Sequence, residues 1–318
     1  MKAISIEKEF VNSKIIDIQE PALKEKQTLI TVKAVGICQS DIARVFNQSA
    51  YYYPIILGHE FSGVDADGNR AAIFPIIPCM NCEECKKENY AQCKTYSYYG
   101  SRQSGGMQEN IAVNDWNCIF NNNLNFEELA AIEPCAVAMN SCNNVPERCE
   151  SVLINGCGFI ALVAAQILLH NNKKVYIRNR NKEKLKFALN TFELEEYNNQ
   201  KIDCVLDFVS TSSSTNFVIE NIESHGTIVA IGNPCENVEI SKTNYSKILR
   251  KELTIKGIWN SKRKDWTDVM SLIENGFVDV KTLITHRYKY TDFKKAFETI
   301  KQNQINNNEL VIKSMLLF

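Results

Sequence analysis

The chain has 318 residues, which is long enough for about two domains with separate hydrophobic cores. With 45% hydrophobic and 23% charged residues, its composition is typical of a globular protein and excludes a disordered or fibrous chain. Its 36 Lys and Arg residues nearly balance its 37 Asp and Glu residues, so charge gives no reason to expect nucleic acid or a membrane as partner. A small molecule is the expected partner.

Neither the N-terminal residues nor the apolar stretch at residues 152–169 predicts targeting to a membrane. Residues 7–9 are Glu, Lys and Glu, and these charges interrupt any secretory signal, so we expect a cytoplasmic protein. Residues 152–169 carry no charge over a length that could span a bilayer. They contain Gly156 and Gly158, however, with β-branched residues before the glycines and helix formers after them. This pattern favours a buried strand, a tight turn and a buried helix.

The first 120 residues predict short strands joined by irregular loops. Alternating or β-branched runs bounded by Pro and Gly predict strands at residues 2–6, 28–35, 60–64 and 70–75. The front half is therefore expected to be mostly β. A short helical pattern follows at residues 126–132.

From residue 151 onward, strands and helices are expected to alternate. The predicted strands are residues 152–154, 174–177, 204–208 and 227–231, and the predicted helices are residues 160–169 and 182–189. Such alternation indicates parallel strands joined by helical crossovers, which is a doubly wound sheet. We expect residues 1–138 and 280–318 to form one domain, and residues 139–279 to form the second.

Four cysteines within fifteen residues predict a metal site. Cys79, Cys82, Cys85 and Cys93 are spaced C-x2-C-x2-C-x7-C. Thiolates at this spacing can converge on one Zn²⁺ and fill its tetrahedral coordination, which is typical of a structural site. We expect the ion to fold a loop that otherwise has little apolar material to bury.

A second, more dispersed set of donors predicts an open metal site. Cys38 lies in Gly-Ile-Cys-Gln-Ser-Asp, His59 and Glu60 lie in Gly-His-Glu-Phe, and Glu133 precedes Pro134. One thiolate, one imidazole and one carboxylate leave a fourth position for water or a substrate oxygen, as a catalytic zinc requires. The carboxylate could be Glu60 or Glu133, and the sequence does not choose between them.

A glycine-rich turn predicts a dinucleotide site in the second domain. Gly156, Gly158 and Ala161 form the pattern G-x-G-x-x-A between a predicted strand and a predicted helix. The first glycine permits the tight turn, the second lets the backbone approach a pyrophosphate, and the small third residue allows close helix packing. The helix N-terminus then faces the phosphates.

The second strand of this domain departs from the pattern expected of an NAD enzyme. An acidic residue normally accepts the adenosine ribose hydroxyls there. This chain has Arg178, Asn179 and Arg180 instead. Without the carboxylate a 2'-phosphate is not repelled, and the two guanidinium groups could bind it, which favours NADP(H). In the alternative, both arginines are solvated and Asn179 binds the ribose of NAD.

Taken in chain order, these motifs resemble those of the zinc-dependent medium-chain alcohol and polyol dehydrogenases. The resemblance covers essentially the whole chain. Residues 52–63, 100–106 and 247–254 are further similar to members of that family that oxidise galactitol 1-phosphate. The resemblance implies a GroES-like catalytic domain beside a Rossmann domain, with the substrate cleft between them, and a homodimer or homotetramer.

The resemblance also implies roles for individual residues. Cys38, His59 and either Glu60 or Glu133 would hold the catalytic zinc, with the second acid nearby. Ser40 matches the hydroxyl that passes the substrate proton outward, and Asp41 is expected to be structural. Arg102, in a loop with flanking glycines, is the cation that we expect to bind a substrate phosphate.

Together these observations predict an oxidoreductase that interconverts a polyol, such as the phosphate ester galactitol 1-phosphate, and the corresponding ketose, with zinc and NAD or NADP as cofactors. One alternative is an NADPH-dependent reductase of ribulose 5-phosphate, which the arginines after the second strand support. Another is a zinc- and dinucleotide-binding regulatory protein without catalytic activity.

Overall fold

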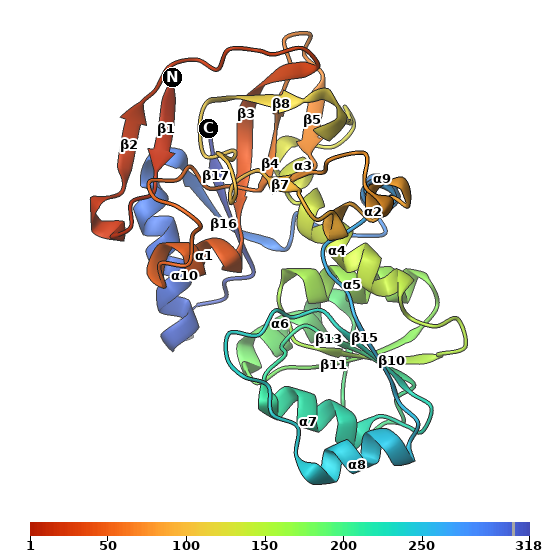
Figure 1. The fold of residues 1–318 in the computed structure, drawn as a ribbon. Helices are drawn as coiled ribbons and strands as arrows, with labels where there is room; N and C mark the ends of the chain where they lie inside the picture. The colour runs from red at the N-terminus through yellow and green to blue at the C-terminus, as the bar shows by residue number, and fades with distance from the viewer. Residues whose placement is uncertain (307–308) are drawn as a thin grey trace. The chain divides into compact units, whose positions relative to one another are not determined.

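The computed structural model describes residues 1–306 and 309–318 (Figure 1), and the chain divides into two compact units. Unit 1 consists of Met1–Pro134, Lys262–Met270 and Val280–Phe318. Unit 2 consists of Cys135–Ser261 and Ser271–Asp279. The predicted zinc ligands therefore fall in unit 1 and the predicted dinucleotide turn in unit 2. That the units are domains with these separate roles stays a prediction.

Unit 1 is built on a mostly antiparallel sheet whose described strands follow the order β16-β17-β3-β4-β5-β9, with β8 paired to β3. The strands are β3 (Gln27–Ile37), β4 (Glu60–Val64), β5 (Arg70–Ile73), β8 (Asn110–Asn114), β9 (Cys118–Phe120), β16 (Ile284–Lys289) and β17 (Lys313–Leu317). Because β17 pairs with β3, the C-terminal end of the chain lies beside the segment that leads into Cys38.

Shorter elements complete unit 1. Two two-stranded sheets are formed by β1 (Lys2–Ser5) with β2 (Lys14–Asp17) and by β6 (Ile76–Ile77) with β7 (Ser97–Tyr98). Helices of this unit include α1 (Gln39–Phe46), α2 (Glu83–Lys86), α3 (Phe126–Ala130) and α10 (Phe293–Asn306). Apolar side chains of β3 and of α10, including Ile30, Val35 and Phe297, are buried in one core. This core holds the start of α1 and the start of β4 in place.

Part of helix α9 (Arg263–Glu274) belongs to unit 1, although the predicted dinucleotide domain, residues 139–279, contains it. Trp266 is buried, and its ring centroid lies 5.2 Å from that of Phe74. Arg263 donates hydrogen bonds to the carbonyls of Trp116 and Cys118. Aromatic contacts of this kind stabilise through both buried area and ring geometry, which explains why residues 262–270 pack with unit 1.

Unit 2 contains a parallel sheet whose described strands follow the order β12-β11-β10-β13-β14-β15. The strands are β10 (Ser151–Asn155), β11 (Lys174–Arg178), β12 (Glu195–Glu196), β13 (Cys204–Asp207), β14 (Thr227–Ala230) and β15 (Thr254–Gly257). The helices are α4 (Ile132–Asn143, which begins in unit 1), α5 (Phe159–His170), α6 (Lys182–Phe192), α7 (Ser212–Asn221) and α8 (Lys242–Arg250).

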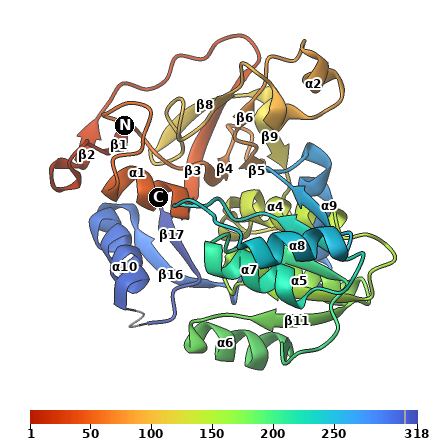
Figure 2. The same ribbon diagram turned by 60° about the horizontal axis from the view of Figure 1, so that its bottom comes forward.

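In chain order this sheet is 3-2-1-4-5-6, which is the doubly wound order of dinucleotide-binding folds. Figures 1 and 2 show α5 on one face of the sheet and α7 with α8 on the other. The predicted fold class, a β-rich domain with a Rossmann domain, is confirmed. Each predicted strand and helix of the second half is present, with ends that differ by at most a few residues. Across the described residues, no helix combines the length and the apolar character that a bilayer span requires.

Candidate metal and cofactor sites

Three of the predicted ligands lie together in unit 1. Cys38 immediately precedes α1, His59 precedes β4, and Glu60 is the first residue of β4. The pairing of β3 with β4 places Gly36 opposite Glu60, which brings the two segments together. One sulfur, one ring nitrogen and one carboxylate oxygen of Cys38, His59 and Glu60 all lie within 4.8 Å of one another. This donor set is chemically suited to Zn²⁺ and leaves room for a further ligand.

The His59 ring is held by a buried carboxylate. Asp41 Oδ1 lies 3.4 Å from His59 Nδ1, while Asp41 Oδ2 accepts a hydrogen bond of 3.1 Å from the backbone N–H of Cys38. The Nδ1 atom is buried and makes no hydrogen bond of regular geometry to any described residue. An imidazole that faces a carboxylate through one nitrogen presents the other to a metal, so the arrangement fits an ion at Cys38 and His59.

Charge at His59 follows from the same neighbours. Burial lowers the pKa of the imidazole, but the anions of Asp41 and Cys38 outweigh burial and hold that pKa well above its ordinary value. A protonated imidazole cannot bind a metal, so a bound ion would replace this proton.

Glu60 has a buried cationic partner that sequence analysis did not find. Lys313, at the start of β17, forms an ion pair with the Glu60 carboxylate, and both side chains are almost completely buried. The Glu60 anion raises the pKa of Lys313 although burial alone lowers it. A lysine before the apolar run Met315–Leu317 is the signal that could have marked it, because a charge there requires a buried partner.

Glu133 lies in the first turn of α4, close to the same cluster. Its carboxylate accepts a hydrogen bond of 3.1 Å from the hydroxyl of Tyr98. Burial raises the pKa of Glu133 to about 7, against the opposing effect of the His59 charge. Glu133 is therefore a buried acid beside the three donors, although the group of atoms within 4.8 Å comprises Cys38, His59 and Glu60 alone among the described residues.

The other two predicted residues of unit 1 are already engaged by neighbours. Ser40 Oγ accepts a hydrogen bond of 2.7 Å from Arg44 Nη1. Arg102 Nη1 donates a hydrogen bond of 2.7 Å to the carbonyl of Tyr96, and the guanidinium lies 4.0 Å from the centroid of the Tyr96 ring and 5.4 Å from that of Tyr51. Arg102 remains exposed, so a ligand can reach it.

The four cysteines of the second cluster also converge. Sulfur atoms of Cys79, Cys82, Cys85 and Cys93 lie within 4.8 Å of one another, and the Cys82–Cys85 distance is 3.5 Å. Backbone N–H groups of Asn81 and Cys82 lower the pKa of Cys79 to about 6, whereas burial raises that of Cys85 to about 12. Four thiols at these distances fit one tetrahedral zinc with no position left open, as predicted for a structural site.

The dinucleotide turn of unit 2 has the backbone that its glycines predict. Gly156, directly after β10, has a φ of +121°, which side chains other than glycine rarely adopt. A Cβ on Gly158, just before α5, would meet no atom within 4 Å, so the space over this turn is open to a ligand. Ala161 is fully buried where α5 meets the sheet. The turn thus fits a pyrophosphate at the N-terminus of α5.

Of Arg178, the last residue of β11, and the two residues after it, Arg178 is turned inward. Its Nη1 donates a hydrogen bond of 3.1 Å to Asn155 Oδ1, and its guanidinium lies 3.5 Å from the centroid of the Phe217 ring. Asn179 is half-buried, with its amide donating to the carbonyl of Asn181, and Arg180 is exposed. Arg180 is therefore the guanidinium with the greater freedom to reach a ligand.

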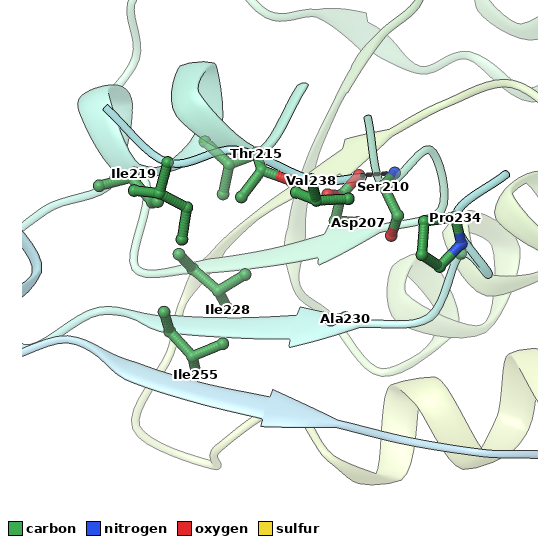
Figure 3. Close-up of a pocket in the computed structure, with 12 residues that line it drawn as sticks. Asp207, Ser210, Thr215, Ile219, Ile228, Ala230, Pro234, Val238 and Ile255 are labelled. Atoms are coloured by element: carbon green, nitrogen blue, oxygen red, sulfur yellow. Dashed lines mark hydrogen bonds between the residues drawn. The ribbon is translucent and has the colours of Figure 1, made fainter. Parts of the chain in front are cut away.

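A cavity of about 260 Å³ lies in unit 2 beneath α7. Figure 3 shows Ile219 of α7, Ile228 of β14 and Ile255 of β15 facing it, with Asp207 and Ser210 at one end. The backbone N–H of Ser210 donates to Asp207. The residues that line the cavity come from β13, α7, β14, β15 and the loops after β13 and β14, and not from the glycine turn.

Two family models match parts of the chain. Residues 24–121 match the model of the alcohol dehydrogenase GroES-like domain, and residues 190–275 match that of the zinc-binding dehydrogenases. Together with the two cysteine-containing donor sets and the parallel sheet, these matches define the class. The chain belongs to the zinc-dependent medium-chain dehydrogenases, a family of oxidoreductases.

Particular relatives are similar over nearly the whole chain. Galactitol 1-phosphate 5-dehydrogenase of Escherichia coli K12 is 28% identical, covering 92% of this chain and 94% of that protein. The crystal structure of galactitol-1-phosphate dehydrogenase from Escherichia coli matches with a TM-score of 0.89 at 26% identity, covering all of both chains. An alcohol dehydrogenase of Escherichia coli CFT073, complexed with NADH, also has a TM-score of 0.89, at 25% identity, covering 100% of this chain and 99% of that one.

Proposed function

We propose that this chain oxidises a secondary alcohol of a polyol phosphate, with galactitol 1-phosphate as the leading candidate, and reduces the corresponding ketose. The observation that carries the proposal is the convergence of Cys38, His59 and Glu60 in unit 1, beside the buried acid Glu133. The 28% identity to galactitol 1-phosphate 5-dehydrogenase supports the substrate class.

In this proposal Cys38 and His59 hold the catalytic zinc, and the third protein ligand is a carboxylate. Glu60 is shared with Lys313, so its bond to a metal competes with a buried ion pair. Glu133 accepts a hydrogen bond from the neutral hydroxyl of Tyr98 and lies close enough for the charge of His59 to affect its pKa. Either acid would therefore complete the protein ligands of the ion, with the other held by its protein partner.

A zinc ion held there would act as a Lewis acid. It would lower the pKa of the alcohol in one direction and polarise the carbonyl group of the ketone in the other. The protein residues orient the alcohol and move its proton. Ser40, two residues after Cys38, accepts the substrate proton while its own proton leaves toward solvent. A nicotinamide cofactor bound over Gly156, Gly158 and Ala161 would supply the hydride acceptor.

We propose NADP(H) as the preferred cofactor, bound over Gly156, Gly158 and Ala161. Asn179 supplies no negative charge to repel a 2'-phosphate, and exposed Arg180 can pair with it. Arg178 contributes a positive field from its place against Phe217. The same residues are the observation that favours the second candidate, an NADPH-dependent reductase of ribulose 5-phosphate.

Arg102 is proposed to bind the substrate phosphate. Its guanidinium lies near the Tyr51 and Tyr96 rings, and the hydrogen bond that Nη1 donates to the Tyr96 carbonyl leaves other N–H donors for an anion. We also propose a structural zinc at Cys79, Cys82, Cys85 and Cys93, and a homodimer or homotetramer, which sedimentation of the purified protein would test.

Initial rates test the proposed function. Purified, zinc-loaded protein is assayed with galactitol 1-phosphate, unphosphorylated galactitol and ribulose 5-phosphate, each with NADP(H) and NAD(H). We expect the highest kcat/KM with galactitol 1-phosphate and NADP⁺, and loss of turnover in Cys38→Ser. Faster reduction of ribulose 5-phosphate would favour the second candidate. Dinucleotide binding without turnover of any of these substrates would favour a regulatory protein.

A further inference from the structure

Ser40 and Arg44 face each other on α1. They are four residues apart, so they lie on the same side of the helix, one turn apart. The Arg44 Nη1 to Ser40 Oγ distance is 2.7 Å, which is typical of a charge-assisted hydrogen bond. Ser40 and Arg44 therefore form a pair rather than two independent surface groups.

The chemistry of this bond fixes the direction of donation. A guanidinium carries only donors, so Ser40 Oγ must be the acceptor. The hydroxyl hydrogen of Ser40 is not used in the bond, and one lone pair on Oγ remains. Ser40 can thus accept a proton from one partner and donate its own to another while Arg44 stays bound.

Arg44 is held in place from two further directions. Its Nη1 lies 3.2 Å from Asp41 Oδ1, and the Asp41 side chain is fully buried while that of Arg44 is 17% exposed. The Tyr53 hydroxyl donates a hydrogen bond of 2.5 Å to the Arg44 carbonyl. Because the guanidinium is fixed to a buried carboxylate, its charge cannot swing away from Ser40 at little cost.

We propose that Arg44 is a positioning residue for proton transfer through Ser40, an inference that rests on the proposed function. In alcohol oxidation the substrate O–H bond breaks and an O–H bond forms on Ser40, while the original Ser40 O–H bond breaks and its proton passes to water. Ser40 ends neutral. The fixed cation stabilises any negative charge that develops on Oγ during the exchange and keeps the remaining lone pair toward the substrate.

Two other roles for Arg44 make different predictions. If Arg44 only neutralised Asp41, its loss would act through His59 and would not depend on Ser40. If Arg44 bound a substrate phosphate, its loss would raise KM for the phosphate ester and leave kcat for unphosphorylated galactitol unchanged. A positioning role lowers kcat for both substrates.

A double-mutant cycle separates these roles. The variants are Ser40→Ala, Arg44→Met and the double variant, with galactitol 1-phosphate and galactitol as substrates and NADP⁺ or, where it is the better cofactor, NAD⁺. Loss of a hydrogen bond to a charged group predicts that Arg44→Met lowers kcat about 10- to 100-fold in the wild-type background. In the Ser40→Ala background it changes kcat by less than about 2-fold. Zinc content, measured on the same samples, stays unchanged.

Arg44→Lys and Arg70→Met complete the design. Arg44→Lys keeps a donor cation and should recover at least about 3-fold of the lost kcat, and it remains informative if Arg44→Met does not fold. Arg70 stacks on Phe126 and donates to the carbonyl of Leu124, so Arg70→Met controls for loss of a structural arginine in the same unit. It should leave kcat unchanged.

An equal loss of kcat from Arg44→Met with and without Ser40, or a loss of zinc in that variant, would overturn the positioning role. A rise in KM for the phosphate ester alone would overturn it in favour of phosphate binding. If the wild-type protein turns over none of the substrates, the proposed function itself is wrong and the inference is rejected with it. The two failures are therefore distinguishable.

Discussion

At the scale of single residues, the Glu60 carboxylate depends on the absence of a side chain at Gly36. A Cβ placed on Gly36 would lie 2.2 Å from Glu60 Oε2 and 3.1 Å from Lys313 Cε. The glycine therefore leaves room for the buried ion pair, and with it for the position of Glu60 beside His59. Gly36 is adjacent in space to the metal donors although it binds nothing itself.

Substituting Gly36 tests this steric requirement. Gly36→Ala should displace Glu60 or Lys313, destabilise the protein by about 1–3 kcal/mol and lower zinc retention at Cys38. Urea unfolding and metal content measure the two effects. Gly257→Ala is the matched control, because a Cβ there meets no atom within 4 Å. If Gly36→Ala is as stable as the wild-type protein in urea, the side chains around Glu60 make room for a Cβ at little energetic cost.

Lys313 provides a second prediction at this scale. Removing one partner of a buried ion pair leaves an unpaired charge, so Lys313→Met should cost about 3–5 kcal/mol in the free energy of unfolding. Adding Glu60→Gln removes the orphaned anion and should restore at least about half of that loss. The comparison is made on metal-free protein by urea unfolding. Equal stability of Lys313→Met and wild type would mean that solvent reaches the pair.

At the scale of elements, a motif within one short segment is predictable from the sequence, whereas a pairing between distant segments is not. The cysteine quartet and the G-x-G-x-x-A turn are predictable because all their groups lie within one short segment. The ion pair of Glu60 with Lys313 joins residues 253 positions apart, and no local pattern specifies which lysine returns to the site. Strand β15 is not predicted for a different reason. All its residues are exposed, so it lacks the apolar run of a buried strand.

The quartet loop tests the structural role assigned to the second zinc. Cys85 is buried and α2 has only four residues, so this loop has little else to fold it. Cys85→Ser should remove one zinc per chain, expose the loop containing Cys79–Cys93 to proteases and lower Tm. Cys235→Ser, at an exposed thiol, is the control. Unchanged zinc content in Cys85→Ser would contradict the assignment.

The end of β11 tests cofactor choice. Asn179→Asp places a carboxylate where NAD enzymes bind the ribose, so it should raise KM for NADP⁺ about 10-fold or more and lower KM for NAD⁺. Lys182→Ala, an exposed cation at the start of α6, should leave the preference unchanged. If Asn179→Asp leaves the ratio of the two kcat/KM values at its wild-type level, discrimination resides elsewhere.

For the whole molecule, sequence patterns predict both the β-rich half and the alternation of parallel strands with helices in the second half, although not every element of that half. Pro, Gly and cysteine spacing mark the first, and alternation of apolar strands with helices marks the second. The assignment of residues 262–270 is not predictable in this way, because it depends on where Trp266 finds an aromatic partner, Phe74. The same limit applies to the choice between Glu60 and Glu133, which depends on what each acid contacts in three dimensions.

The most direct test of the central claim is an anomalous diffraction map of the zinc-loaded protein, measured at the zinc absorption edge. The account predicts two peaks per chain, one within about 2.3 Å of the Cys38 sulfur and bound to His59, and the other among the four cysteines of the quartet. A single peak at the quartet, with none between Cys38 and His59, would contradict it.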